Sequence, residues 1–156
     1  MAGVTAYIGL GANLGDAQAS VKQAMQAVSF LPRTTVTARS PLYLSAPLDA
    51  AGPDYVNAVV EVATDLAEIE LLDALQAIEN AAGRERPFHH APRTLDLDVL
   101  LYGDLVLSSK RLTLPHPRMY DRAFVLRPLA DIAPSRVSAA QLHAVAGQTV
   151  RRIDES

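Results

Sequence analysis

The sequence predicts an α+β domain in which two helices cover one face of an antiparallel sheet. Three observations support this fold class. Strand-forming and helix-forming runs follow one another in the order strand, helix, strand, strand, helix, strand. The 156 residues are 49% apolar and 20% charged, which suits one domain with a hydrophobic core. We find no internal repeat, low-complexity tract or linker, so residues 1–156 are expected to form a single domain.

The first elements follow from local patterns. Residues 5–10, TAYIGL, are rich in strand formers and end at a glycine-containing turn. Asp16 is a good N-cap for a helix whose apolar residues recur at helical spacing until Pro32 ends it. Residues 34–40 are β-branched and polar, which predicts a second strand that residues 42–45 can continue.

The second half of the sheet is predicted in the same way. After a loop at residues 46–54, residues 57–64, NAVVEVAT, predict a strand. Residues 66–82 give the clearest helix, with a broad apolar stripe and Gly83 as its stop. Residues 94–102 predict the fourth main strand. The resulting βαββαβ order is typical of the ferredoxin-like fold.

Additional elements are expected toward the C-terminus. They are a short strand at residues 105–107, a loop or one-turn helix at 113–122, a buried segment at 124–129 and a modest helix at 138–146. The predicted fold is therefore an α+β, ferredoxin-like βαββαβ unit with its helices on one sheet face, plus C-terminal additions.

Composition excludes several classes of function. Acidic residues outnumber basic ones 17 to 14, whereas a nucleic-acid binder needs a basic surface. The chain has no cysteine, which excludes disulfides and thiolate metal sites. The N-terminal segment lacks the features of a signal peptide, and no apolar run is long enough to span a bilayer. We therefore expect a cytoplasmic protein that binds neither nucleic acid nor membrane. Separately from these arguments, we expect a monomer.

Asp96 and Asp98 interrupt an otherwise apolar strand. Side chains at i and i+2 of a strand share one face, so the two carboxylates should lie about 6–7 Å apart at the backbone. The alternate residues are expected to face the helices, and they are Leu95, Leu97, Val99 and Leu101. Paired carboxylates repel each other unless a cation lies between them, and Mg²⁺ prefers oxygen ligands. The plain alternative is a solvated sheet face, which is the commoner case for such a pair on its own.

Arginines make phosphate chemistry more plausible around this pair. Twelve of the 14 basic residues are arginine, and five flank the aspartates in sequence: Arg84, Arg86, Arg93, Arg111 and Arg122. The guanidinium group suits phosphate oxygens. No glycine-rich phosphate loop is present, because Gly9, Gly11 and Gly15 do not have the required spacing.

Two further segments could contribute to a phosphate site. The loop RERPFHHAP, residues 84–92, is interpreted as a lid over the site or as an ordinary charged surface loop. Arg111, Thr113 and His116 can all reach phosphate oxygens, although a lone histidine is more often a surface residue. His89 and His90 are adjacent and do not have the spacing of a helical zinc pair.

Several segments together resemble the 6-hydroxymethyl-7,8-dihydropterin pyrophosphokinases of folate biosynthesis. They are YIGLGANLGD, GPDYVNAVVEVAT, IENAAGRER, PRTLDLDVLLYG and RLTLPHPRMYDRAFVLRPLADIAP, which span the chain from about Ala6 to Pro134. The resemblance implies a ferredoxin-like pyrophosphokinase domain that uses two Mg²⁺ ions. It also implies an Mg-dependent transfer of diphosphate from ATP to the hydroxymethyl group of the reduced pterin, with release of AMP.

The resemblance also assigns roles to residues. Asp96 and Asp98 would be the metal ligands and, with Arg84 and Arg93, the catalytic residues. The ATP contacts would be Gln76, Glu79, Arg84, Arg86, Arg93, Val99, Arg111, Thr113 and His116. The pterin contacts would be Ser45, Ala46, Leu48, Tyr55, Asn57, Asp96, Arg122 and Phe124.

These assignments make chemical sense for a flat heteroaromatic ligand. Tyr55 and Phe124 can stack on the faces of the ligand, and Asn57 can form hydrogen bonds with its edge. Tyr55 and Phe124 could instead be core residues. The chain departs from the family at the lid, where the usual tryptophan is missing and Phe88 or His90 is the nearest substitute.

The residues alone leave two other functions open. A phosphohydrolase could use the same aspartates on water, and it would turn over ATP without any pterin. A non-catalytic ferredoxin-like module could bind a small ligand without needing Mg²⁺.

Overall fold

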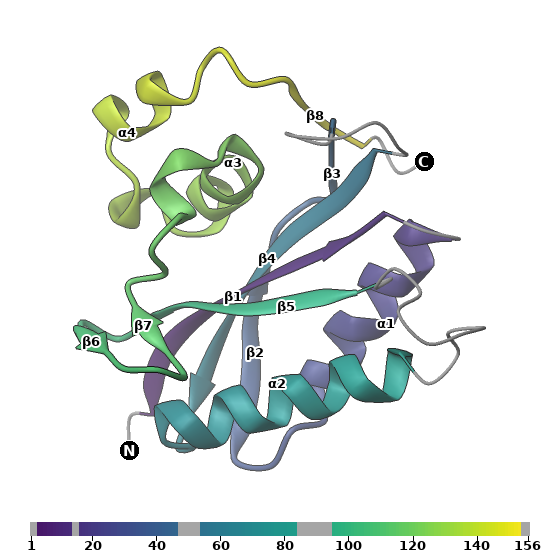
Figure 1. Ribbon diagram of the computed structural model, residues 1–156, viewed down its shortest axis with the longest axis vertical. Helices are drawn as coiled ribbons and strands as arrows, with labels where there is room; N and C mark the ends of the chain where they lie inside the picture. Colours follow the sequence, from purple (N-terminus) through teal and green to yellow (C-terminus); the bar gives the residue numbers. More distant parts are fainter. Residues whose placement is uncertain (1–2, 14–15, 47–53, 84–94, 154–156) are drawn as a thin grey trace.

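The computed structural model describes residues 3–13, 16–46, 54–83 and 95–153 (Figure 1). The main sheet and its helices are formed by β1 (Val4–Ala12), α1 (Ala17–Ser29), β2 (Thr34–Arg39), β3 (Tyr43–Ser45), β4 (Tyr55–Thr64), α2 (Glu68–Gly83) and β5 (Asp96–Tyr102). They are followed by β6 (Leu107–Ser108), β7 (Thr113–Leu114), η1 (Met119–Asp121), α3 (Ala123–Ile132), η2 (Pro134–Arg136), α4 (Ala139–Ala144) and β8 (Val150–Arg152).

The main sheet is antiparallel and confirms the predicted fold class. Its strands lie in the order β5-β1-β4-β3-β8, and β2 also pairs with β4. β2 and β3 occupy the two ends of β4, because Thr34 pairs with Thr64 whereas Tyr43 pairs with Asn57. Between them, the Ser40 hydroxyl accepts a hydrogen bond from Val59 N–H, while Ser40 N–H donates to the Val59 carbonyl. The predicted second strand is therefore two short strands along one edge of β4.

Two apolar cores lie on opposite faces of the sheet. The core beneath α1 and α2 includes Val21, Val28, Leu71 and Leu75, all of which are fully buried. The other core lies under α3 and joins sheet residues to the apolar side of that helix. Figure 1 shows α3 and α4 on one side of the strands and α1 and α2 on the other. The helices of the βαββαβ unit thus share one face, as predicted, and the C-terminal additions cover the second.

A bulge in β5 corrects the expected orientation of Leu101. Val99 pairs with Ile8 and Leu101 pairs with Tyr7, so Leu100 has no partner in this register. The extra residue reverses the alternation of side chains. Leu101 therefore packs in the core under α3, and not with Val99 in the core under α1 and α2.

The helix boundaries largely follow their sequence signals. Asp16 caps α1 by accepting a hydrogen bond from Ala19 N–H at 3.1 Å. α3 was predicted only as a buried segment, because Pro128 lies inside it and lacks the N–H that would bond the carbonyl of Phe124. Within the described ranges, no helix is both long and apolar enough to cross a membrane.

Candidate active site

Two hollows meet at the start of β5. We call the first, of about 330 Å³, the aromatic pocket, because Tyr55 and Phe124 line it. We call the second, of about 360 Å³, the polar pocket; it lies against α2, β5 and β7, and Arg111 and His116 line it. Asp96 and Asp98 line both hollows. The aspartate pair predicted from the sequence therefore stands where two potential ligand sites join.

The two aspartates face glycines on the neighbouring strand. Asp98 pairs with Gly9, and Asp96 pairs with Gly11. Both glycines line the aromatic pocket. A Cβ on Gly11 would lie 3.1 Å from Asn57 Nδ2, so a larger residue would displace that amide. The glycines on β1 therefore leave room for a hollow beside the two carboxylates.

Hydrogen bonds from outside the sheet hold this part of β5. Leu97, between the two aspartates, donates its backbone N–H to Glu79 Oε2 at 2.7 Å. His116 N–H donates to the carbonyl of Leu100, the bulged residue, at 2.9 Å. An edge strand exposes such backbone groups unless something pairs with them. α2 and the segment after β7 thus fix the strand that carries the carboxylates.

His116 presents a nitrogen to Asp98. Its Nε2 lies 4.0 Å from Asp98 Oδ2, while its Nδ1 accepts a hydrogen bond from Arg118 N–H at 3.2 Å. Burial lowers the pKa of His116, and Arg122 and Arg118 lower it further, while Asp98 opposes them. In the neutral ring with Nδ1 as acceptor, Nε2 carries the proton. His116 can therefore donate a hydrogen bond toward the polar pocket without carrying a charge.

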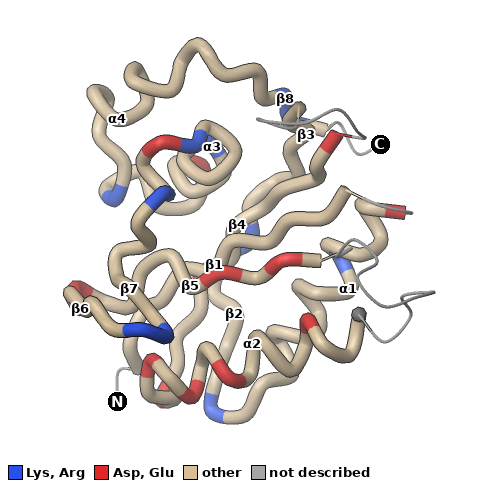
Figure 2. The backbone as a smooth tube through the Cα atoms, in the orientation of Figure 1, with Lys and Arg blue, Asp and Glu red and all other residues tan. Residues whose placement is uncertain are grey.

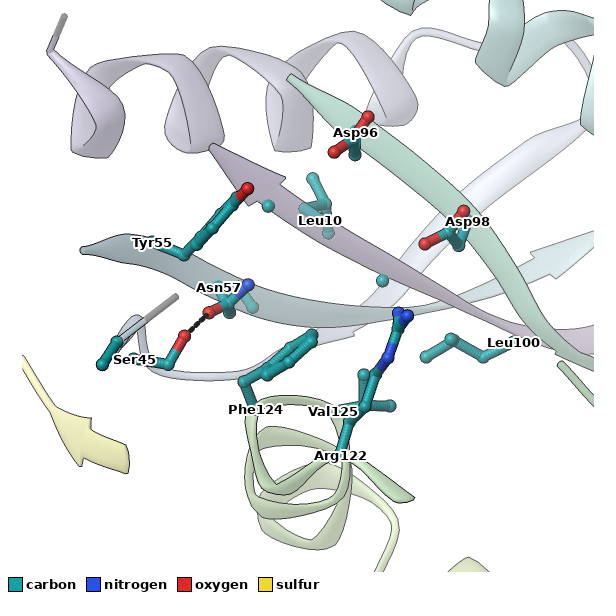
Figure 3. A pocket seen from close by; sticks show the side chains of 14 residues that line it. Leu10, Ser45, Tyr55, Asn57, Asp96, Asp98, Leu100, Arg122, Phe124 and Val125 are labelled. Carbon is teal, nitrogen blue, oxygen red and sulfur yellow. Dashed lines mark hydrogen bonds between the residues drawn. The ribbon is translucent and has the colours of Figure 1, made fainter. Parts of the chain in front are cut away.

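Asn57 is fixed at the base of the aromatic pocket. The Ser45 hydroxyl donates to Asn57 Oδ1 at 2.7 Å, and each residue is only 5% exposed. Because a hydroxyl donor engages the oxygen, the amide nitrogen is directed away from Ser45 (Figure 3). The pocket therefore presents an N–H donor to the edge of a bound ligand.

Aromatic and cationic groups border the same hollow. Tyr55 comes from β4 and Phe124 from the first turn of α3, with Asn57 between them (Figure 3). The Arg122 guanidinium lies 5.4 Å from the centre of the Phe124 ring. Both aromatic residues are partly exposed, and Phe124 also packs against the core under α3, so its ring combines a core contact with a face open to the pocket. A planar ligand could stack on either ring.

Side chains of α2 hold the Arg111 guanidinium in the polar pocket. Arg111 Nη2 donates to Asp73 Oδ1 at 2.6 Å and to Gln76 Oε1 at 3.1 Å. The charged side chains are about half exposed, at 48% for Arg111 and 58% for Asp73. Such surface ion pairs contribute little and rearrange easily. Figure 2 shows acidic residues along α2 and β5 and basic residues beside β7.

The structure brings most of the predicted site residues into two groups. The aromatic pocket contains Ser45, Ala46, Tyr55, Asn57, Asp96, Arg122 and Phe124. The polar pocket contains Gln76, Glu79, Val99, Arg111, Thr113 and His116. The remaining residues lie outside the described part of the chain: Leu48, Arg84, Arg86 and Arg93, together with Phe88 and His90 of the expected lid.

Sequence reasoning missed Gly9 and Gly11. Their spacing excludes a glycine-rich phosphate loop, and they belong to the segment YIGLGANLGD that carries the family resemblance, but the sequence alone assigns them no role in the site. The predicted fold could have revealed their role. In the ferredoxin-like arrangement, the first and last strands of the unit lie side by side, which places these glycines next to the aspartates. A glycine-x-glycine strand next to an aspartate-x-aspartate strand predicts an open hollow beside the carboxylates.

The two carboxylates suit Mg²⁺ as a metal partner. Across the described residues, no cluster of three or more histidine, aspartate or glutamate side chains could hold a metal ion. Within residues 3–13, 16–46, 54–83 and 95–153, Asp96 and Asp98 are a carboxylate pair that leaves the remaining positions around a cation open to water or substrate. That donor set is typical of Mg²⁺ bound through one or two carboxylates and substrate phosphates.

Comparisons with known proteins agree with this arrangement. The family model described as 7,8-dihydro-6-hydroxymethylpterin-pyrophosphokinase matches residues 7–134. The 2-amino-4-hydroxy-6-hydroxymethyldihydropteridine pyrophosphokinase of Pseudomonas aeruginosa is 50% identical over 129 residues, which cover 82% of this chain and 80% of the relative. The Haemophilus influenzae protein of the same name is 46% identical over 135 residues, covering 86% and 84% of the two chains.

A solved structure supports the fold. It is described as HPPK-DHPS in complex with substrates, and it matches with a TM-score of 0.66 at 12% identity. The match covers 92% of this chain and 43% of that one, so this chain corresponds to less than half of the longer protein. At this identity, the likeness concerns the fold alone.

Proposed function

The chain belongs to the 7,8-dihydro-6-hydroxymethylpterin-pyrophosphokinase family, and on that basis we propose that it transfers diphosphate where the aromatic and polar pockets meet. The donor is ATP, the acceptor is the hydroxymethyl group of 6-hydroxymethyl-7,8-dihydropterin, and AMP is released, as a step of folate biosynthesis. The observation that carries this proposal is that Asp96 and Asp98 line both pockets.

The pterin occupies the aromatic pocket. Its flat ring stacks on Tyr55 and Phe124, which border the hollow from different elements. Asn57 donates an N–H to an acceptor on the ring edge, because Ser45 engages the amide oxygen. The hydroxymethyl arm then points toward the carboxylates of β5, which line the same hollow.

ATP occupies the polar pocket. Arg111, Thr113 and His116 supply hydrogen-bond donors for phosphate oxygens. Arg111 exchanges its weak surface pairing with Asp73 for the more highly charged phosphates. Arg84, Arg86 and Arg93 neutralise further phosphate charge, which is the role that the resemblance implies for them. The β-phosphate then lies at the junction of the two pockets.

Asp96 and Asp98 hold the metal ions in this proposal. When bound, two Mg²⁺ ions would neutralise phosphate charge and favour loss of the hydroxyl proton. Glu79 and His116 keep the strand of the carboxylates in place through the backbone of Leu97 and Leu100. The protein thus contributes mainly position and charge, as is usual in phosphoryl transfer.

The transfer itself is a displacement at the β-phosphorus. The hydroxymethyl oxygen attacks in line, a new oxygen–phosphorus bond forms, and the bond from the β-phosphorus to the oxygen of the AMP group breaks. Two separately filled pockets place the attacking oxygen and the leaving group on opposite sides of that atom. Arginines near the phosphates stabilise the developing charge.

Paired substitutions test this division of the site. Phe124→Leu removes a stacking ring, worth about 0.5–1.5 kcal/mol, and should weaken pterin binding about 2- to 13-fold. Arg111→Gln removes charged hydrogen bonds of about 1.5–3 kcal/mol and should weaken ATP binding about 10- to 160-fold. Each variant should leave the other ligand unaffected in equilibrium titrations with single ligands. The proposal fails if both variants weaken the same ligand, or if Phe124→Leu weakens only ATP.

A further inference from the structure

We propose that the C-terminal segment of residues 145–153 is a positioning element for the aromatic pocket, and that Gln148 is its positioning residue. The segment lies beyond residues 7–134, which the family model matches. The inference rests on the proposed function, because it concerns how the pterin pocket is shaped. It follows from contacts that this segment makes with two walls of the pocket.

Gln148 fixes the backbone on both sides of Arg122. Its Oε1 accepts a hydrogen bond from Ala123 N–H at 2.9 Å, and its Nε2 donates to the carbonyl of Asp121 at 2.7 Å. One side-chain amide thereby holds the peptide group before Arg122 and the one after it. Arg122 lines the aromatic pocket, so these two bonds set the direction from which it enters.

The hydrogen bond between Gln148 and Ala123 also caps the start of α3. Arg122 is the N-cap residue, with φ −127° and ψ 113°, and its own side chain makes no capping hydrogen bond. A helix begins with backbone N–H groups that need partners, and Gln148 provides one for Ala123. Phe124 follows one residue later, so the first turn that carries it is held by a residue of the C-terminal segment.

The segment of residues 145–153 also contacts β3, which carries Ser45 and forms a second wall of the aromatic pocket. β8 pairs with β3, with Val150 opposite Ser45. Ile153 N–H also donates to the carbonyl of Leu42 at 2.8 Å. Ser45 in turn orients Asn57. Figure 1 shows the segment passing from α4 beyond α3 to β3.

Apolar contacts hold the segment between these two attachments. Val145 is 4% exposed and belongs to the core under α3, and Val150 packs against that core. The segment therefore joins the wall that carries Arg122 and Phe124 to the wall that carries Ser45. Loss of the Gln148 bonds should let the first turn of α3 shift relative to β3, which changes the pterin site and leaves the polar pocket intact.

Gln148→Met tests this role. Methionine is an unbranched side chain of similar length, so packing is largely kept while both hydrogen bonds are lost. Gln141→Met is the matched control, because the Gln141 side chain also accepts a hydrogen bond from the backbone, at Ser138 N–H. This bond belongs to the capping box of α4, which lies away from both pockets. Dissociation constants for 6-hydroxymethyl-7,8-dihydropterin and for a non-hydrolysable ATP analogue with Mg²⁺ are measured separately, together with the melting temperature.

We expect Gln148→Met to raise the pterin dissociation constant about tenfold, which corresponds to about a tenth of the molecules keeping the pocket in its binding arrangement. The constant for the ATP analogue should stay within about twofold in the same titrations. Gln148→Glu keeps the acceptor for Ala123 but loses the donor to Asp121, so its effect on the pterin constant should lie between those of the unsubstituted protein and Gln148→Met. Gln141→Met should lower the melting temperature and leave both constants unchanged.

Two results would overturn the inference. One is an unchanged pterin constant in Gln148→Met, and the other is an equal rise in Gln141→Met, which would indicate general loosening of the C-terminal segment. Gln148→Glu gives the same test if the methionine variant does not fold. Failure of the unsubstituted protein to bind pterin would instead overturn the proposed function as well.

Discussion

Replacing Ser45 with alanine removes the hydroxyl that orients Asn57 in the aromatic pocket. That hydroxyl donates to Asn57 Oδ1 at 2.7 Å, and both residues are 5% exposed. Its loss leaves a buried acceptor without this donor, at a cost of about 1–3 kcal/mol. We expect the free energy of unfolding to fall by about that amount.

The effect of Ser45→Ala on pterin affinity should be much smaller. Without the hydroxyl, the Asn57 amide can also turn its oxygen toward the pocket. If both orientations become equally populated, half of the molecules present the N–H donor, and the dissociation constant rises only about twofold. Discrimination against analogues that carry a donor at that ring edge should weaken, because the turned amide now accepts from them.

Two measurements on the same variant separate these effects. Urea unfolding gives the stability loss, and fluorescence titration gives the pterin dissociation constant. Ser45→Thr is the control, since it keeps a hydroxyl and should behave like the unsubstituted protein. Unchanged stability would refute the assigned hydrogen bond. A rise in the dissociation constant of about 100-fold, or about 2.7 kcal/mol, would mean that the Ser45 hydroxyl contacts the pterin directly.

Three further predictions concern other parts of the molecule. Gly11→Ala places a Cβ 3.1 Å from Asn57 Nδ2 and should weaken pterin binding about tenfold. Glu79→Ala removes the acceptor for Leu97 N–H and should lower kcat, while Glu79→Gln, which keeps an oxygen there, should retain more activity. Burial, with the hydrogen bonds to Glu61 and Asp131, raises the pKa of Tyr7 and Tyr43 to about 12 from an ordinary value of 10. Their contribution to stability should therefore be complete below about pH 10 and be lost as the pH rises toward 12, and Phe at both positions should flatten the unfolding profile there.

Each of these predictions can fail in a recognisable way. Normal pterin affinity in Gly11→Ala would mean that the hollow beside the aspartates is not the ligand site. Equal activity of the two Glu79 variants would show that the bond to Leu97 N–H does not position β5. A profile between pH 10 and 12 that is unaffected by the Tyr7 and Tyr43 substitutions would contradict the raised pKa values.

Local sequence patterns predicted the central unit because its signals agree with one another. The Asp16 cap, the apolar stripe of α2 and the β-branched run of β4 each indicate the element that forms. The pairing of Asp96 and Asp98 on one strand face followed from strand periodicity alone. The grouping of the other site residues came from the family resemblance, and the structure places the described ones around two hollows.

The missed features depend on contacts between distant segments. The bulge at Leu100 comes from pairing with β1 and anchoring by His116, and no local pattern marks it. β8 is a three-residue strand that forms only because β3 offers it an edge. α3 carries Pro128 in its interior, which local propensity treats as a break, yet burial of Leu126 and Leu129 against the sheet stabilises it.

The most direct test of the central claim is AMP formation from ATP and Mg²⁺, measured with and without 6-hydroxymethyl-7,8-dihydropterin. The account predicts AMP only when the pterin is present, with no ADP and no free phosphate. It also predicts that Asp98→Ala abolishes this AMP while circular dichroism shows an intact fold. AMP without pterin, release of free phosphate, or near-normal turnover in Asp98→Ala would contradict diphosphate transfer at the junction of the two pockets.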